Sequence, residues 1–226
     1  MRYKYLLLLL ILFSNILNAQ SLVVQSEGSE GPIFPAPGWR AENGANATNI
    51  SFSRIAAAGT NNPNASALSG GGSSMLMLNS FVANAGESTF LISKPYDFSN
   101  NGGVDPTFSF WMYRDNTNAS NNDKIEVFWN NTPTTTSMVA INHSAGVNYI
   151  NRPVSSFPVV PTVGWYQYTF TLPAASYNGK KNYFIVKGTS EFGANIYLDN
   201  FVCNTYPSAM DVADVSIDLV SQNLAT

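Results

Sequence analysis

Short runs in which apolar and polar residues alternate recur along most of the chain, and no segment shows sustained helical periodicity. In an extended strand, side chains at every second residue lie on one face. The runs are rich in Val, Ile, Tyr, Phe, Trp and Thr, and clusters of Asn, Gly and Pro separate them, which is typical of antiparallel strands joined by turns. The pattern predicts strands at 74–78, 89–93, 107–113, 124–129, 137–141, 165–172, 183–188 and 195–203, with weaker ones at 22–24 and 50–55.

These strands predict an all-β fold, an antiparallel two-sheet jelly-roll β-sandwich. About eight to ten strands suit this architecture, whose core forms where the inner faces of both sheets interdigitate. Alternation within the clearest runs identifies the side chains that face the core. They are Phe108, Phe110 and Met112; Ile125, Val127 and Trp129; and Tyr166, Tyr168 and Phe170.

Residues 1–19 are typical of a secretory signal peptide. Arg2 and Lys4 precede an apolar run at 6–12, and a polar break leads to Ala19, after which we expect cleavage. The alternative is an uncleaved membrane anchor, but the run is shorter than the roughly 20 apolar residues that a span needs. No second apolar span follows, so we expect a jelly-roll domain over 20–204 that is secreted or held at the cell surface.

The character of the sequence changes after Cys203. Residues 205–210 predict a linker, and the stretch that follows alternates again, with Val215, Ile217 and Leu219 on one face. An isolated strand does not fold alone. We interpret 211–226 as the first strand of a second, Ig-like β domain that the sequence cuts short. The alternative is that this strand joins the main sheet.

Composition excludes several functions. Only 11% of the residues are charged and the net charge is −3, and no cluster of Lys or Arg is present to neutralise phosphates, which argues against nucleic acid. Cys203 is the only cysteine and His143 the only histidine, so an internal disulfide, a zinc site and a Ser–His–Asp triad lack support. No predicted strand repeats Glu-x-Asp or Glu-x-Glu, the pattern expected of paired glycosidase carboxylates. We predict that the domain is not an enzyme.

Asp199 is the most informative polar residue. Strict alternation places it with Tyr197, Phe201 and Cys203 on one face of strand 195–203, and both faces of this strand are largely apolar. A partly buried carboxylate is costly unless it is paired, hydrogen-bonded or metal-bound. The first and last strands of jelly rolls commonly lie together, so we expect an acidic residue near the first strand to approach Asp199. The candidates are Glu27 and Glu30.

Several segments carry a family resemblance when they are taken in order: Pro37-Gly38-Trp39, residues 90–99 with 108–113, residues 123–128 with 164–168, and residues 194–201. Together they resemble the MAM-like, concanavalin A-like jelly rolls of bacterial surface proteins, which include cleaved-adhesin and choice-of-anchor J domains. The resemblance spans residues 25–203. It implies a secreted, multidomain protein of Bacteroidota-like bacteria, in which further domains of the same polypeptide are expected.

The resemblance also implies a structural Ca²⁺, because related jelly rolls bind this ion with acidic residues from their first and last strands. Here these are Glu27, Glu30 and Asp199, and backbone carbonyls of the loop 27–31 could supply further oxygen ligands. The alternative is that Asp199 accepts backbone N–H bonds and that both glutamates are solvated.

A sugar-binding platform is the remaining candidate chemistry, because aromatic rings stack on the apolar faces of pyranoses. The candidate residues are Trp129 and Trp165, with Tyr149, Arg114, Asp115 and Asp123 in nearby loops. Against this, alternation turns Trp129 inward, and Trp111 lies in an apolar run typical of a core. We predict a non-catalytic adhesion or binding module for a glycan or an extracellular protein. The alternative is an accessory or spacer domain of a larger secreted hydrolase such as a peptidase.

Overall fold

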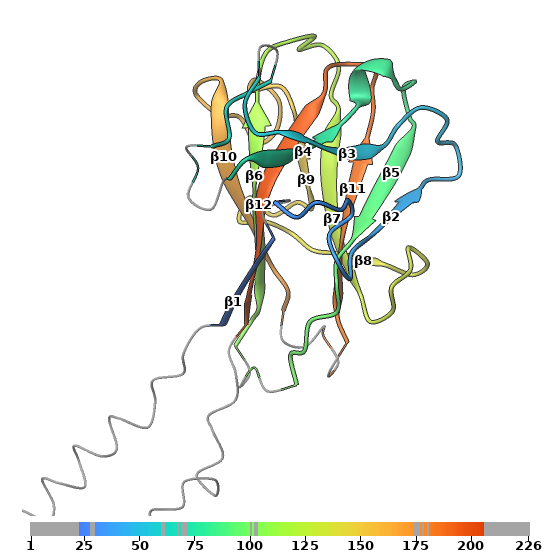
Figure 1. The fold of residues 1–226 in the computed structure, drawn as a ribbon, viewed down its shortest axis with the longest axis vertical. Coiled ribbons are helices and arrows are strands. Elements are labelled where there is room, and N and C mark those ends of the chain that lie inside the picture. The colour runs from blue at the N-terminus through green and yellow to red at the C-terminus, as the bar shows by residue number, and fades with distance from the viewer. Residues whose placement is uncertain are drawn as a thin grey trace, which may run out of the picture.

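The fold is known from a computed structural model that describes residues 23–27, 30–59, 62–66, 68, 72–99, 101, 104–173, 177, 179 and 181–205. Two six-stranded antiparallel sheets face each other across the core (Figure 1). The one helical element within these residues is a short 3-10 turn, η1 (Ser80–Val82). The predicted all-β, two-sheet sandwich is confirmed.

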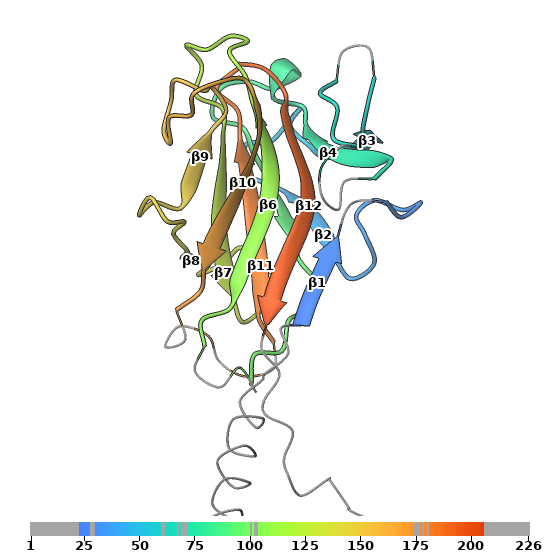
Figure 2. The ribbon, with the colours of Figure 1, turned by 90° about the vertical axis from the view of Figure 1, so that its left-hand side faces the viewer.

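The first sheet has the strand order β10 (Gly164–Thr171), β6 (Thr107–Arg114), β12 (Ile196–Thr205), β4 (Ser74–Leu78) and β3 (Phe52–Ala56). A further strand, β1 (Val23–Glu27), pairs with the later half of β12 and sets Glu27 opposite Phe201 and Val23 opposite Thr205. Figure 2 shows β10, β6, β12 and β1 side by side. The first and last strands of the sandwich are therefore neighbours, as expected.

The second sheet has the strand order β2 (Arg40–Asn43), β5 (Ser88–Ile92), β11 (Tyr183–Thr189), β7 (Lys124–Asn130) and β8 (Val139–Ala140), and β9 (Tyr149–Asn151) also pairs with β7. The predicted runs coincide with every strand of the described residues except β2 and β9, which have four and three residues. β2 has one apolar residue, Ala41, and β9 has only three residues, whereas the two-residue β8 was recognised because it lies in the longer run at 137–141.

Aromatic side chains fill the space between the sheets. Phe184 of β11 stacks on Phe108 of β6 with ring centroids 4.4 Å apart, and Phe201 of β12 lies 6.0 Å from the same Phe108 ring. The predicted core residues are buried, with the exception of the half-buried Tyr166. The expectation for Trp111 was wrong, because this side chain is half-buried and outside the core cluster.

A β-bulge in β12 changes the predicted face of Asp199. The register shifts between Asp199 and Val202, and Asn200 has a positive φ of 50°. One extra residue reverses which side chains point inward. Phe201 and Cys203 therefore point into the core, as Ile196 and Leu198 do. The prediction that Asp199 shares a face with Phe201 and Cys203 was wrong.

Glu87 closes the loop before β3 and was not anticipated from the sequence. Its carboxylate accepts hydrogen bonds from the hydroxyl of Thr48, the backbone N–H of Asn49 at 2.9 Å and the side-chain amide of Asn84 at 2.6 Å. The bond from the Thr48 hydroxyl and the backbone bond from Asn49 hold the pKa of Glu87 well below its usual value of 4.5.

Glu87 should therefore make stability depend on pH. Because the folded state lowers its pKa, the ionised group stabilises the fold fully above the unfolded-state pKa, and this contribution declines as pH falls below about 4.3. We expect the difference in melting temperature between the wild type and Glu87→Gln to be constant above pH 6 and to shrink at lower pH. Thermal melts from pH 3 to 7 measure it, and a difference that grows on acidification would contradict this assignment.

Several expectations fall outside the described residues. These are the signal peptide at 1–19, the linker beyond Thr205, which ends β12, and the second-domain strand at 211–226. Within the described residues, no helix has the length and apolar character that crossing a membrane requires.

Candidate functional site

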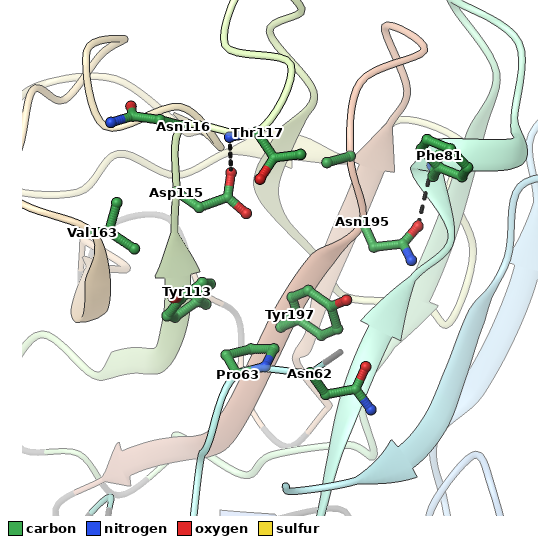
Figure 3. Close-up of a pocket in the computed structure, with 11 residues that line it drawn as sticks. Asn62, Pro63, Phe81, Tyr113, Asp115, Asn116, Thr117, Val163, Asn195 and Tyr197 are labelled. Atoms are coloured by element: carbon green, nitrogen blue, oxygen red, sulfur yellow. Dashed lines mark hydrogen bonds between the residues drawn. The ribbon is translucent and has the colours of Figure 1, made fainter. Parts of the chain in front are cut away.

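A hollow of about 690 Å³ is lined by residues from η1, the end of β6 and the start of β12. These parts lie at the end of the sandwich that is uppermost in Figures 1 and 2. Tyr113 at the end of β6 and Tyr197 at the start of β12 form part of its wall. Its rim is completed by Asn62, Pro63, Phe81, Asp115, Asn116, Thr117, Val163, Ala194 and Asn195 (Figure 3). The volume falls in the range of sites that hold small molecules.

The aromatic residues of the hollow meet at steep angles. The rings of Tyr113 and Tyr197 lie 6.4 Å apart with an interplanar angle of 78°. Trp165 packs edge-on against Tyr113 at 5.5 Å and donates a hydrogen bond from Nε1 to the carbonyl of Asn64 at 2.9 Å. Trp165 does not itself line the hollow. It fixes the position of Tyr113, which does.

Asp115 places a carboxylate beside these rings. Its Oδ1 accepts hydrogen bonds from the backbone N–H of Thr117 at 3.0 Å and from the guanidinium of Arg152. Its Oδ2 has no hydrogen-bond partner within the described residues, and Figure 3 shows the carboxylate directed into the hollow. Burial raises the pKa of Asp115, and the charge of Arg152 opposes that rise.

Asp123 holds together the loops around the hollow. Its side chain is fully buried, and Oδ1 accepts hydrogen bonds from Ser80 Oγ at 2.5 Å and from the N–H groups of Glu191 and Gly193. Its Oδ2 accepts from Arg152 Nε at 3.1 Å and from the N–H of Ala194. A Cβ at Gly193 would lie 1.9 Å from Oδ2, so this close approach requires glycine.

Arg114 is also a structural group. It is fully buried and donates to the carbonyls of Arg152 at 2.9 Å and Pro153 at 2.6 Å and to the hydroxyl of Tyr168 at 2.6 Å. Burial lowers its pKa. The expectation that Arg114, Asp123 and Trp129 contact a ligand needs correction, because Arg114 and Asp123 have no exposed surface and Trp129 belongs to the buried core.

Tyr149 lies in a different place from Asp115 and Trp165. It lines a polar hollow of about 450 Å³ with Lys124, Asn151 and Glu191 among others. The ammonium of Lys124 lies 5.8 Å from the centroid of its ring. Of the predicted sugar-binding residues, only Asp115 lines the larger hollow, and Trp165 packs behind its Tyr113 wall.

His143 has the surroundings of a packed side chain. Its ring lies edge-on against Phe170 at 5.6 Å and Tyr168 at 6.1 Å, and Nδ1 accepts a hydrogen bond from the N–H of Ala145. Burial lowers its pKa. Among the residues that the structure describes, no carboxylate bonds to this ring, so its geometry is not that of a catalytic base oriented by an acid.

The proposed calcium ligands meet only part of what the ion needs. Asp199 is fully buried, its Oδ2 has no hydrogen-bond partner, and burial raises its pKa to about 7. Glu30 lies close enough for its charge to add to that rise. An orphaned buried oxygen of this kind fits a cation. However, the Glu30 carboxylate already accepts hydrogen bonds from the N–H groups of Ser73 and Ser74, at 2.7 and 3.2 Å.

Glu27 cannot be placed as a ligand, because only its backbone is described. That backbone runs beside Phe201, two residues from Asp199. Among the described side chains, no group of three His, Cys, Asp or Glu residues gathers as a metal site would. Two carboxylates and backbone carbonyls would have to supply most of the 6–8 oxygen ligands of Ca²⁺.

Solved structures with the same arrangement identify the fold. The K1 cleaved adhesin domain of Lys-gingipain from Porphyromonas gingivalis W83 matches with a TM-score of 0.54 and 18% identity, over 80% of this chain and 97% of that domain. The K2 domain matches with a TM-score of 0.51 and 15% identity, over the same shares. The chain has the cleaved-adhesin fold. At these identities the likeness shows the fold and not the function.

A carbohydrate-binding module that recognises mannan matches with a TM-score of 0.43 and 13% identity, over 82% of this chain and 98% of that module, which is too distant to support an argument. The sequence matches no protein-family model and no curated protein.

On this cleaved-adhesin fold, the sequence reasoning missed most of the hollow. Tyr113 and Tyr197 were assigned only to strands, and Asn116, Thr117 and Asn195 were given no role. The sequence did contain a signal for the hollow, because polar residues directly follow or precede strands at one end of the sheet. Residues 115–117 follow β6, and Asn195 precedes β12.

Proposed function

We propose that this domain is a non-catalytic binding module of an exported, MAM-like surface protein and that it takes a glycan in the hollow between β6, β12 and η1. The observation that carries the proposal is the combination of aromatic rings and polar side chains, among them the Asp115 carboxylate, in one open hollow. Apolar walls with a few convergent polar groups are characteristic of small-ligand sites.

The position of the hollow also supports binding. Val23 and Thr205 are paired at the end of the sandwich that is lowest in Figure 2, and the hollow lies at the opposite end. A module joined to further domains through these ends would present the hollow away from them. Export, a cell-surface location and further domains of the same polypeptide remain parts of the proposal.

Glycan binding should depend on Tyr113. We expect the chain from residue 20 onward to give saturable signals on a glycan array and Tyr113→Ala to weaken binding at least ten-fold, because the variant removes a wall of the hollow. Tyr149→Ala is the matched control, since Tyr149 is a half-buried tyrosine in the other hollow. Equal losses in both variants would place the site elsewhere, and no signal from the folded wild type would favour the spacer alternative.

We also propose a structural Ca²⁺ held by Asp199 with Glu30 and Glu27. The ion would satisfy the buried Oδ2 of Asp199 and stabilise the contact between the first and last strands. Ligands that bind only the native state raise its stability. We expect EDTA to lower the melting temperature, added Ca²⁺ to restore it, and Asp199→Asn to abolish the response. Identical melts with and without chelator would remove the ion from this account.

A further inference from the structure

We propose that the ligand of the hollow is a neutral, hydroxyl-rich saccharide whose hydroxyl groups donate hydrogen bonds to Oδ2 of Asp115. This inference rests on the proposed function and specifies the ligand class of the same site. Three observations carry it: the charge of the hollow, the kind of polar groups that line it, and the rigid placement of Asp115.

The charge of the hollow disfavours anionic sugars. Among the residues that the structure describes, its lining contains the Asp115 carboxylate and no Lys, Arg or His side chain. The Asp115 carboxylate forms an ion pair with Arg152. The guanidinium of Arg152 is fully buried and also pairs with Asp123. A uronate, sialate or sulfate in the hollow would face the Asp115 carboxylate, and the buried guanidinium of Arg152 has no exposed surface with which to bind the charge of the ligand.

The remaining polar groups match hydroxyls. Asn62, Asn116 and Asn195 contribute neutral amides, and Tyr113 and Tyr197 contribute phenols. Burial, together with the charge of Asp115, raises the pKa of both tyrosines, so they stay protonated. Amides and phenols both donate and accept hydrogen bonds, whereas Oδ2 of Asp115 only accepts. Asn195 already accepts a hydrogen bond from the N–H of Phe81 at 3.1 Å. A ligand rich in hydroxyl groups can bond to the groups that remain.

The apolar groups suit one sugar ring better than an extended chain. Tyr113 and Tyr197 stand nearly perpendicular, at 78°, so they form a corner and not a flat platform. Phe81 and Val163 sit at the rim with 59% and 47% of their surfaces exposed. A pyranose can place its apolar face against one ring while its hydroxyls reach Asp115 and the amides.

Asp115 is held ready for this contact. Arg152 and the N–H of Thr117 fix Oδ1, which leaves Oδ2 oriented before a ligand arrives. Preorganised groups bind more tightly because little conformational freedom is lost on binding. A site that accepts a hydrogen bond from a ligand hydroxyl also rejects ligands without that hydroxyl. With such a ligand, the half-buried carboxylate oxygen would lose its water and gain no hydrogen-bond partner.

The test is an array that carries neutral galactose-, mannose- and xylose-based oligosaccharides beside uronate-, sialate- and sulfate-bearing glycans. We expect the full mature chain to bind neutral glycans. Asp115→Asn keeps the shape and the Oδ1 bonds but replaces the free acceptor with a donor, and it should weaken binding about 10- to 100-fold. Asp97→Asn is the control, because exposed Asp97 makes the same kind of turn bond, to the N–H of Ser99 at 2.9 Å, outside the hollow.

A second variant covers the case in which Asp115→Asn disturbs Arg152 and lowers the melting temperature. Asn116 is exposed at the rim and its side chain makes no hydrogen bond within the described residues. Asn116→Lys should therefore fold normally and raise the acidic-to-neutral binding ratio by introducing a cation. An unchanged ratio would overturn the inference.

The outcomes separate this inference from the proposed function. Binding of acidic glycans alone would overturn the neutral-saccharide assignment and leave the binding-module proposal standing. Neutral binding that survives within two-fold in a fully folded Asp115→Asn would overturn the role of Asp115. The absence of any glycan binding by the folded wild type would overturn both.

Discussion

Replacing Asp123 with Ala is expected to lower the free energy of unfolding by about 3–5 kcal/mol. The change leaves the guanidinium of Arg152 buried with only the Asp115 carboxylate as its charge partner. It also removes the acceptor for Ser80 Oγ and for the N–H groups of Glu191, Gly193 and Ala194. Removing one partner of a buried ion pair lowers the free energy of unfolding by more than the pair contributes, because the remaining charge and hydrogen-bond donors stay desolvated.

Urea unfolding measures this loss. Glu191→Ala is the matched control, because Glu191 is an exposed acidic residue at the same end of the sandwich, and surface changes of this kind usually stay within about 0.5 kcal/mol. If Asp123→Ala and Glu191→Ala unfolded at the same urea concentration, Asp123 would not organise this end of the molecule.

Replacing Phe184 with Ala should cost a similar amount, about 3–5 kcal/mol. Its ring is buried between the sheets, stacks on Phe108 at 4.4 Å and meets Tyr96 and Phe98 edge-on at 5.7 and 6.2 Å. The variant loses this apolar contact and leaves a cavity in a close-packed core. Phe81→Ala is the control of the same residue type, since Phe81 is 59% exposed.

Thermal or urea unfolding of the two variants gives a direct comparison. A large loss in Phe184→Ala and a small one in Phe81→Ala is the result that face-to-face packing of the sheets predicts. Equal stabilities of the two variants would mean that side-chain packing between the sheets does not stabilise the fold.

The fold could be predicted because short runs of apolar, β-branched and aromatic residues mark most strands, and several of these runs alternate with a period of two. Phe108, Phe110 and Met112 follow one another at every second position and all reach the core. The rule failed at Asn200, where one extra residue in β12 reverses the inward face for Phe201 and Cys203. A bulge leaves no alternation signal of its own, because its effect depends on pairing with β6, a strand far away in the sequence.

The site was harder to predict because it is assembled from strand ends and loops that are far apart in the sequence. Asp115 was among the candidates, but the rings beside it come from Tyr113 and from Tyr197, which is far away in sequence. Trp129 and Arg114 were chosen for their chemistry, and burial removes both from the surface. Residue type identifies groups that can bind a sugar. Only the packing of loops on the sheets decides which of them remain exposed.

We propose that the domain acts through the hollow at one end of the sandwich. A ¹H–¹⁵N NMR titration of the mature chain with the neutral oligosaccharide that gives the strongest array signal tests this claim most directly. We expect the amide signals that move to come from residues 115–117 and 195–197. Shifts confined to β2, β5 and β11 of the second sheet, with residues 115–117 unmoved, would contradict it.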